Sequence, residues 1–410
     1  MKSTVLRALF FGLILTLVLI ANPRPGRADG DDDDLKLIGA IPNPGATHLA
    51  VDISYVNYRT NRYFVADVSN KAVDVFDAER GKLLGQITGG FHGFFNSATD
   101  NPACDAPPNP GQGFDGRGPS GVLVANDQRL WVTDFTGTQG VVKVFEMEGA
   151  EPPFANVPST MVTIPIPGSH CRADELSFDP EDHIVLVGLP EGMATTTPAF
   201  IPVPLFVLIS SDPPYKVLET MQFPTASGME QSVWDAKLHR FLVNVPNVGI
   251  VVVNPRDLDE TNPPIYAGTE PGCQGAGLAL GPSQHLLVGC SSGPDAVLDA
   301  RTGTVLKVFD PTEVANSDEV WFNPGDGNFY ASSNFTSPSP ALAVVDADDL
   351  TFKQDLPTAF GSHSVAASEE NNHIFVPIQL TPTKPDVCHN TFSYIPANTG
   401  CIFVFANSDE

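Results

Sequence analysis

The chain has 410 residues, a formal net charge of −26 and a sequence pI near 4.5. So acidic a surface repels nucleic acid and anionic membranes, so neither is expected as a partner. Only 17% of the residues are charged and 42% are hydrophobic, which provides the apolar surface for a core and excludes a disordered acidic chain. The 35 glycines and 38 prolines indicate many turns.

The N-terminal segment has the pattern of a secretory signal. Lys2 and Arg7 precede an apolar run over 8–21, which is too short to span a bilayer, and Gly26-Arg27-Ala28 ends in a small residue suited to signal peptidase. We expect cleavage after Ala28, with a cut after Ala21 as the alternative.

Three regions therefore follow from the sequence: a signal peptide over 1–28, an acidic disordered arm over 29–34 and one domain over 35–410. The mature protein is expected to be a secreted monomer, periplasmic or extracellular, with no membrane insertion.

Six cysteines in an exported chain indicate disulfides. No pair has C-x-x-C spacing, which argues against thioredoxin chemistry, a zinc ribbon and covalent haem. Among the pairings that six cysteines allow, we favour Cys104–Cys171, Cys273–Cys290 and Cys388–Cys401. The second pair flanks a predicted hairpin, and the third closes a loop before the last predicted strand.

Short apolar strands recur along the chain and share a six-residue frame, which ends in a turn-forming Asp, Asn, Gly or Ser. The seven copies of the frame are Thr47–Asp52, Gly121–Asn126, Asp174–Asp179, Glu230–Asp235, Ala276–Gly281, Asp318–Asn323 and His363–Ser368. Three further strands follow each copy, at a repeat spacing typical of propellers and solenoids. The pattern predicts an all-β fold, a seven-bladed β-propeller of four-stranded antiparallel blades.

The last copy runs out of chain before its outer strand. The segment Leu35–Ile41 can supply this strand and close the ring, which removes the exposed sheet edges. Six or eight blades remain as alternatives, because the long segments 90–120 and 190–215 can be divided differently.

Two short motifs resemble the YVTN-type repeats of bacterial propellers. They are Phe64-Val65-Ala66-Asp67 and Asp74-Val75-Phe76-Asp77, which follow a His-x-x-Val-Asp strand. The wider superfamily includes NHL-repeat and lactonase-like propellers, and the resemblance covers nearly the whole mature chain. The resemblance implies the propeller fold. It does not imply one activity, because members of such families include hydrolases, lyases and binding scaffolds.

The inner strands of a propeller run the same way, so their first residues converge at one mouth of the ring. Polar residues occupy the first two frame positions, and the candidate metal ligands there are Asp174, Glu175, Glu230, Asp318 and Glu319. Crowded carboxylates must be protonated, paired or bound to metal. An oxygen-donor set favours calcium, whereas adding a histidine shifts the preference toward zinc or manganese. Candidate general bases are His48 and His363.

The resemblance to lactonase-like propellers implies a metal at this mouth. The first copy departs from their pattern, because it has His48 where those enzymes carry Glu. We therefore keep an alternative in which the acids form a polar ring and Arg172 neutralises one of them.

Two functions compete. One is a metal-dependent hydrolase of lactone or ester type, or a lyase, acting on a small molecule. The other is a non-catalytic scaffold that binds a protein or small-molecule ligand through its loops at 90–120, 190–215 and 388–401. A nucleotide cofactor is not expected, because the glycine-rich stretch 111–121 lacks a phosphate-binding lysine and a following helix.

Overall fold

A computed structural model describes residues 34–45, 50–100, 104, 118–194, 202–259, 262–266, 273–333, 340–380 and 385–407. The predicted signal peptide, the acidic arm up to residue 33 and His48 lie outside the described residues. None of the helices in the described ranges is long and apolar enough to cross a membrane.

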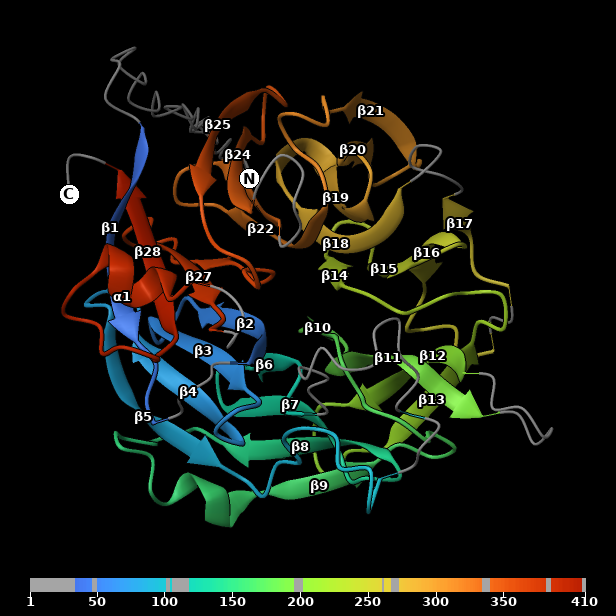
Figure 1. The fold of residues 1–410 in the computed structure, drawn as a ribbon. Helices are drawn as coiled ribbons and strands as arrows, with labels where there is room; N and C mark the ends of the chain where they lie inside the picture. Colours follow the sequence, from blue (N-terminus) through green and yellow to red (C-terminus); the bar gives the residue numbers. More distant parts are fainter. Residues whose placement is uncertain are drawn as a thin grey trace, which may run out of the picture.

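Seven four-stranded antiparallel sheets form a ring, which confirms the predicted seven-bladed β-propeller (Figure 1). The inner strands are β2 (Val51–Asn57), β6 (Val122–Ala125), β10 (Leu176–Asp179), β14 (Ser232–Asp235), β18 (Gln274–Leu280), β22 (Ser317–Asn323) and β26 (Ala366–Ala367). Each inner strand packs against the inner strands of both neighbouring blades, so the ring is continuous.

The second and third strands of each blade follow outward. The second strands are β3 (Arg62–Asp67), β7 (Arg129–Phe135), β11 (Ile184–Ala194), β15 (Arg240–Val245), β19 (His285–Ser292), β23 (Asn328–Ser333) and β27 (Ile374–Ile378). The third strands are β4 (Ala72–Asp77), β8 (Gly140–Glu146), β12 (Pro202–Ser210), β16 (Gly249–Val253), β20 (Ala296–Asp299), β24 (Ala341–Asp346) and β28 (Cys401–Asn407).

Outer strands and short helices complete the described elements. The outer strands are β5 (Lys82–Thr88), β9 (Val162–Pro165), β13 (Val217–Gln222), β17 (Ile265–Tyr266), β21 (Thr304–Val308), β25 (Phe352–Pro357) and β1 (Leu35–Pro42). The helices are η2 (Val157–Thr160), η3 (Pro282–Gln284) and α1 (Val387–Thr391).

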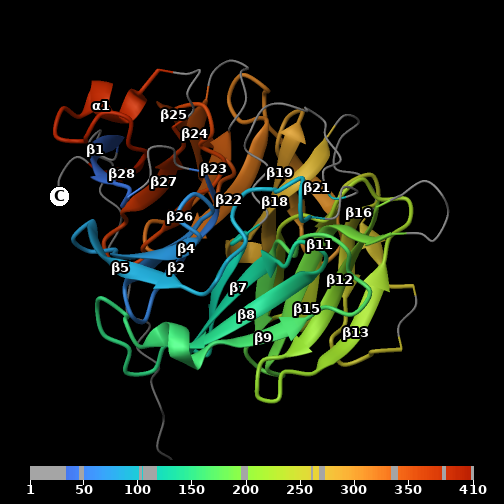
Figure 2. The same cartoon turned by 60° about the horizontal axis from the view of Figure 1, so that its bottom comes forward.

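The N-terminal strand closes the ring, as predicted. Strand β1 pairs antiparallel with β28, from Leu35 opposite Asn407 to Pro42 opposite Cys401. Figures 1 and 2 both show these two strands side by side at the outer edge of the seventh blade. The two ends of the domain are therefore held together in one sheet, with no open blade between them.

The core lies between neighbouring blades. Trp131 of the second blade is fully buried in a cluster with residues of the third, and its ring meets Tyr215 edge-on at 5.6 Å between ring centroids. The second and third strands have blades packed on both faces, so strands such as β23 are buried at every position. Because both faces are buried, the sequences of these strands are continuous apolar runs rather than alternating apolar and polar residues.

Two sequence predictions need correction. The first inner strand is not Thr47–Asp52, because β2 spans Val51–Asn57 and turns at Asn57, whose Oδ1 accepts a hydrogen bond from the Thr60 amide. The segment 190–215 is not mainly a surface loop, because β11 and β12 occupy most of it and pair with each other. Extending those strands satisfies backbone groups that a long loop would leave exposed.

The three predicted disulfides are all present, Cys104–Cys171, Cys273–Cys290 and Cys388–Cys401. The third joins the second residue of α1 to the first residue of β28, next to the closing pair with β1. The first fixes the residue that directly precedes Arg172, so it holds that arginine at the entrance to the third blade.

Candidate functional site

The starts of the inner strands bring together a group of charged side chains from five places in the sequence. We call it the mouth cluster, and it consists of Asp52, Arg172, Asp174, Glu175, Glu230, Asp318, Glu319 and His363. Asp174, Glu175 and Glu319 are each less than a tenth exposed, and the other members are partly buried.

Arg172 is the centre of one half of the cluster. Its Nη1 lies 2.9 Å from Asp52 Oδ2, and its Nη2 lies 2.9 Å from Asp174 Oδ2. A second contact, from Nη1 to Asp174 Oδ1 at 3.1 Å, makes the pair with Asp174 bidentate. Glu191 Oε2 lies farther away, 4.0 Å from Arg172 Nε. The guanidinium thus ties the first blade to the third.

His363 of the last blade faces the same aspartate. Its Nε2 lies 3.6 Å from Asp52 Oδ1, and its Nδ1 lies 3.2 Å from the carbonyl oxygen of Gly361, while Gln379 Nε2 donates to the carbonyl of Val51. Burial alone would lower the pKa of His363, but the carboxylates of Asp52 and Asp318 outweigh it and raise the pKa to about 9. The imidazole is therefore protonated at neutral pH.

Asp52 itself stays ionised. Burial acts to raise its pKa, and its contacts with His363 and Arg172 overcome this effect and lower the pKa below the ordinary value. Asp174 behaves differently although it also pairs with Arg172. Its burial, together with the charges of Asp52 and Glu191, raises its pKa to about 7.

Glu175 of the third blade and Glu319 of the sixth share a hydrogen bond across the ring. Two carboxyl groups can share such a bond only when one of them carries a proton. Burial is the main cause that raises the pKa of each glutamate well above its ordinary range, and neighbouring carboxylates add to it.

The remaining two acids, Glu230 and Asp318, form no ion pair within the part of the chain that the structure describes, although Arg172 acts on both, and His363 on Asp318, from farther away. Burial and the nearby Asp318 raise the pKa of Glu230 well above its usual value. Burial also raises the pKa of Asp318, against the opposing charge of His363. The cluster therefore contains more carboxyl groups than its two cationic side chains can neutralise, and protons make up part of the difference.

The metal site expected from the resemblance does not fit these residues well. Arg172 stands between Asp52 and Asp174, where a bound cation would need free carboxylate oxygens. In the part of the chain that the structure describes, no group of three or more His, Cys, Asp or Glu side chains is arranged to hold a metal ion. The calcium, zinc or manganese site stays a prediction.

The structure unites all five predicted acids and His363 in one cluster, and it adds a residue that the sequence analysis missed. Asp52 takes the first frame position of the first blade, the place expected for Thr47, because the strand begins later than predicted. The spacing between the turn residue and the second strand identifies the correct frame of the first blade. Asn57 lies five positions before the second strand at Arg62, as Asp179 does before Ile184 and Asp235 before Arg240.

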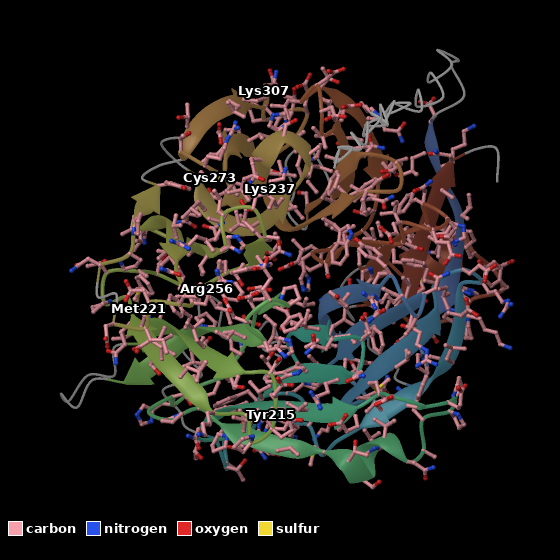
Figure 3. All side chains as sticks on the ribbon, turned by 180° about the vertical axis from the view of Figure 1, so that it is seen from behind. Tyr215, Met221, Lys237, Arg256, Cys273 and Lys307 are labelled. Atoms are coloured by element: carbon pink, nitrogen blue, oxygen red, sulfur yellow. A yellow bond between two sulfur atoms is a disulfide. The ribbon has the colours of Figure 1, made fainter. Side chains whose placement is uncertain are left out.

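At the ends opposite the mouth cluster, His183 and His239 lie in the turns that follow the inner strands β10 and β14. His183 pairs with Asp212 at 2.7 Å, and His239 pairs with Glu181 at 2.8 Å. Arg256, labelled in Figure 3, joins the same Glu181 across the junction of the third and fourth blades. These histidines therefore hold turns and neighbouring blades together, and they do not meet at one site.

No protein-family model matches the chain, and no curated protein matches it in sequence. Solved structures match its fold. A chain of the mitotic checkpoint complex is 15% identical, with a TM-score of 0.56, 89% of this chain covered and 96% of that chain.

Two further structures are similar to the same extent. The U3-55K structure is 11% identical, with a TM-score of 0.59 and coverage of 90% of this chain and 98% of that one. The RRP9 WD40 repeats are also 11% identical, with a TM-score of 0.58, covering 91% and 97%. At these identities the similarity shows the fold alone, so this chain shares a seven-bladed β-propeller fold with WD40 proteins.

Proposed function

We propose that the protein is an exported, non-catalytic β-propeller that binds a positively charged group of a partner or small ligand at the mouth cluster. The observation that carries the proposal is the imbalance of charge. Among the described residues, six buried or half-buried carboxyl groups face two cationic side chains, Arg172 and His363. An incoming cation would replace protons on these carboxyl groups and form charge-assisted hydrogen bonds with them.

The contacts within the cluster support binding more than catalysis. A general base must be unprotonated to accept a proton, whereas the raised pKa of His363, about 9, keeps it charged at neutral pH. Arg172 already occupies the oxygens of Asp52 and Asp174, which a catalytic metal would need. The predicted hydrolase or lyase activity therefore has less support than the scaffold.

The fold comparison also favours a binding scaffold over an enzyme. WD40 structures are among its structural neighbours, and one of them is described as part of a mitotic checkpoint complex. The three disulfides agree with folding in an oxidising compartment. The assignment to YVTN-type or lactonase-like propellers belongs to the same proposal and rests on the two repeat motifs.

Calorimetric titration with a short oligolysine peptide tests the proposal. The wild-type protein should bind it at neutral pH, and an oligoglutamate peptide of equal length should not bind. The double variant Glu230→Gln, Asp318→Asn keeps the shape of the cluster and should weaken binding by about tenfold or more. The exposed-site variant Glu79→Gln is the matched control and should bind like the wild type. Equal binding by the double variant would overturn the proposal.

A further inference from the structure

The second blade contains a small site for a cation that is filled by a lysine. Lys143 Nζ lies 2.7 Å from Asp134 Oδ2 and donates hydrogen bonds to the carbonyl oxygens of Gly89 at 2.9 Å and Gly90 at 2.8 Å. The ammonium also lies 4.7 Å from the centre of the Phe91 ring. A buried carboxylate, two carbonyl groups and an aromatic face thus surround one positive charge.

The first blade repeats this site with an acid in place of the lysine. Lys143 pairs with the residue two positions before Asp134, and Asp74 pairs with Val65, two positions before Asp67. Gly89 and Gly90 follow the outer strand that precedes the second blade. In the same way, Asn43 and Pro44 follow β1, the outer strand that precedes the first blade. Asp67 and Asp74 therefore stand where the second blade has Asp134 and Lys143.

Oxygen and amide groups crowd around these two aspartates. Asn43 Nδ2 donates to Asp67 Oδ2 at 3.2 Å, and Asn70 Nδ2 donates to the same oxygen at 2.5 Å and to the Pro44 carbonyl at 2.6 Å. Gln86 Nε2 donates to Asp74 Oδ1 at 2.8 Å. Both carboxyl groups are fully buried and lie against each other. Burial, reinforced by the neighbouring Asp67, raises the pKa of Asp74 well above its ordinary value.

The two carboxyl groups share a side-chain hydrogen bond, so one of them carries a proton, and the buried Asn43 Oδ1 has no hydrogen-bond donor among the described residues. Asn43 is 4% exposed, so solvent does not satisfy this oxygen. Neither aspartate contacts a lysine, arginine or histidine in the described part of the chain. The aspartate pair therefore holds a proton and no cationic side chain at the place where the next blade has an ammonium.

We propose that the first blade binds one calcium ion between Asp67, Asp74 and Asn43, in the place that the Lys143 ammonium fills in the second blade. Two carboxylates supply the charge that a divalent ion requires. The donors are all oxygens from carboxylate, amide and the nearby Pro44 carbonyl, which is the ligand set that calcium prefers. The set has no histidine or cysteine, which zinc would favour.

The position of this site gives the ion a structural role. The Asn43 amide donates to the carbonyl of Gly400 at 3.0 Å, and the preceding Pro42 pairs with Cys401 of the last blade. The ion would therefore join the first blade to the segment that leaves the ring-closing strand β1. Calcium binding is thus expected to stabilise closure of the ring, and this role is independent of the mouth cluster.

The test uses the full mature protein, treated with a chelator and then titrated with calcium chloride by calorimetry, with thermal unfolding measured in parallel. The wild type should bind one ion per chain at the site and unfold at a higher temperature with calcium than with chelator. Asp74→Lys imitates the second blade, so it should abolish binding and make the unfolding temperature independent of calcium. Asn43→Ala is a milder change and should weaken affinity by about tenfold.

A variant of the mouth cluster separates this site from the proposed binding function. Asp318→Asn should bind calcium as the wild type does. The inference is overturned if the wild type binds no calcium at millimolar concentration, if folded Asp74→Lys protein still binds one ion, or if Asp318→Asn loses it. Should Asp74→Lys fail to fold, unchanged affinity in Asn43→Ala overturns the inference in the same way.

Discussion

Arg172 and Asp52 form an ion pair of 2.9 Å that reaches from the entrance of the third blade to the first blade. The second blade lies between the first and the third, and its first frame residue is Gly121, which packs against Asp174, the other carboxylate that Arg172 binds. A Cβ at Gly121 would lie 2.2 Å from the Asp174 carbonyl oxygen. The arrangement of charge at the mouth thus depends on a residue that carries no charge.

Replacing Arg172 with methionine should destabilise the fold. The side chain is mostly buried and pairs with two carboxylates, which would keep their burial and lose their counter-charge. Breaking such a pair costs about 3 kcal/mol in the free energy of unfolding, measured by urea denaturation at neutral pH. Arg172→Lys retains a charge and should lose less. Wild-type stability of Arg172→Met would show that the pair contributes nothing.

Gly121→Ala should displace the chain at the start of the third blade. The added methyl group would overlap the Asp174 carbonyl, so the backbone must move and the contacts of Asp174 with Arg172 must loosen. Such overpacking costs about 2 kcal/mol in unfolding free energy. Gly39→Ala provides the control, because its nearest contact is an ordinary 3.6 Å from the Tyr394 hydroxyl. Equal effects of the two changes would contradict the close approach at Gly121.

Stability should fall as the pH rises from mildly acidic to alkaline. Glu319 has a pKa raised well above its ordinary value and Asp174 a pKa of about 7, so the folded protein keeps protons that the unfolded chain releases. Their stabilising contribution is complete below the ordinary carboxyl pKa and is lost as the pH rises through the folded pKa. His363, with a pKa of about 9, adds a further loss above its unfolded pKa.

Urea denaturation at about pH 5.5 and about pH 8.5 checks this dependence. The wild type should be less stable at the higher pH, by about 2 kcal/mol or more, since Asp174 titrates within this interval and one pKa unit corresponds to about 1.4 kcal/mol. Glu319→Gln removes one titrating group and should make the slope shallower, whereas the exposed Glu79→Gln should leave it unchanged. A stability that rises with pH over this interval would contradict the protonated carboxyl groups.

Loss of the last disulfide should weaken ring closure. Changing both Cys388 and Cys401 to serine releases the loop around α1 and the start of β28, which pairs with the closing strand β1. A disulfide that closes a loop of this length contributes about 3 kcal/mol. Thermal unfolding should therefore begin at a lower temperature, and limited proteolysis should first cut near α1. Unchanged stability would mean that β1 alone holds the ring closed.

The repeat pattern was sufficient to predict the seven-bladed architecture, because each blade has the same order of hydrophobic strands and turn residues. It failed at the first inner strand, since Thr47–Asp52 ends with apolar residues and an aspartate and so imitates the frame. The true strand ends at Asn57, so the correct frame is Asp52–Asn57. The longer spacing from Asp52 to Arg62 was the signal that distinguishes them.

The membership of the mouth cluster, apart from Asp52, followed from topology, because inner strands start at the same end of the ring. The partners within it did not follow. Sequence cannot tell that Arg172 bonds Asp52 and Asp174, or that Glu175 meets Glu319 from the opposite side, since these contacts join distant blades. The charge balance of each carboxyl group depends on those distances and on burial.

The most direct measurement follows proton release when the oligolysine peptide is added to the protein in weakly buffered solution near pH 6.5. The bound cation lowers the pKa of the protonated carboxyl groups, so the wild type should release protons in proportion to the peptide bound. The double variant Glu175→Gln, Glu319→Gln should release markedly fewer. Binding of the peptide with no proton release by the wild type, or no binding at all, would contradict a mouth that receives positive charge.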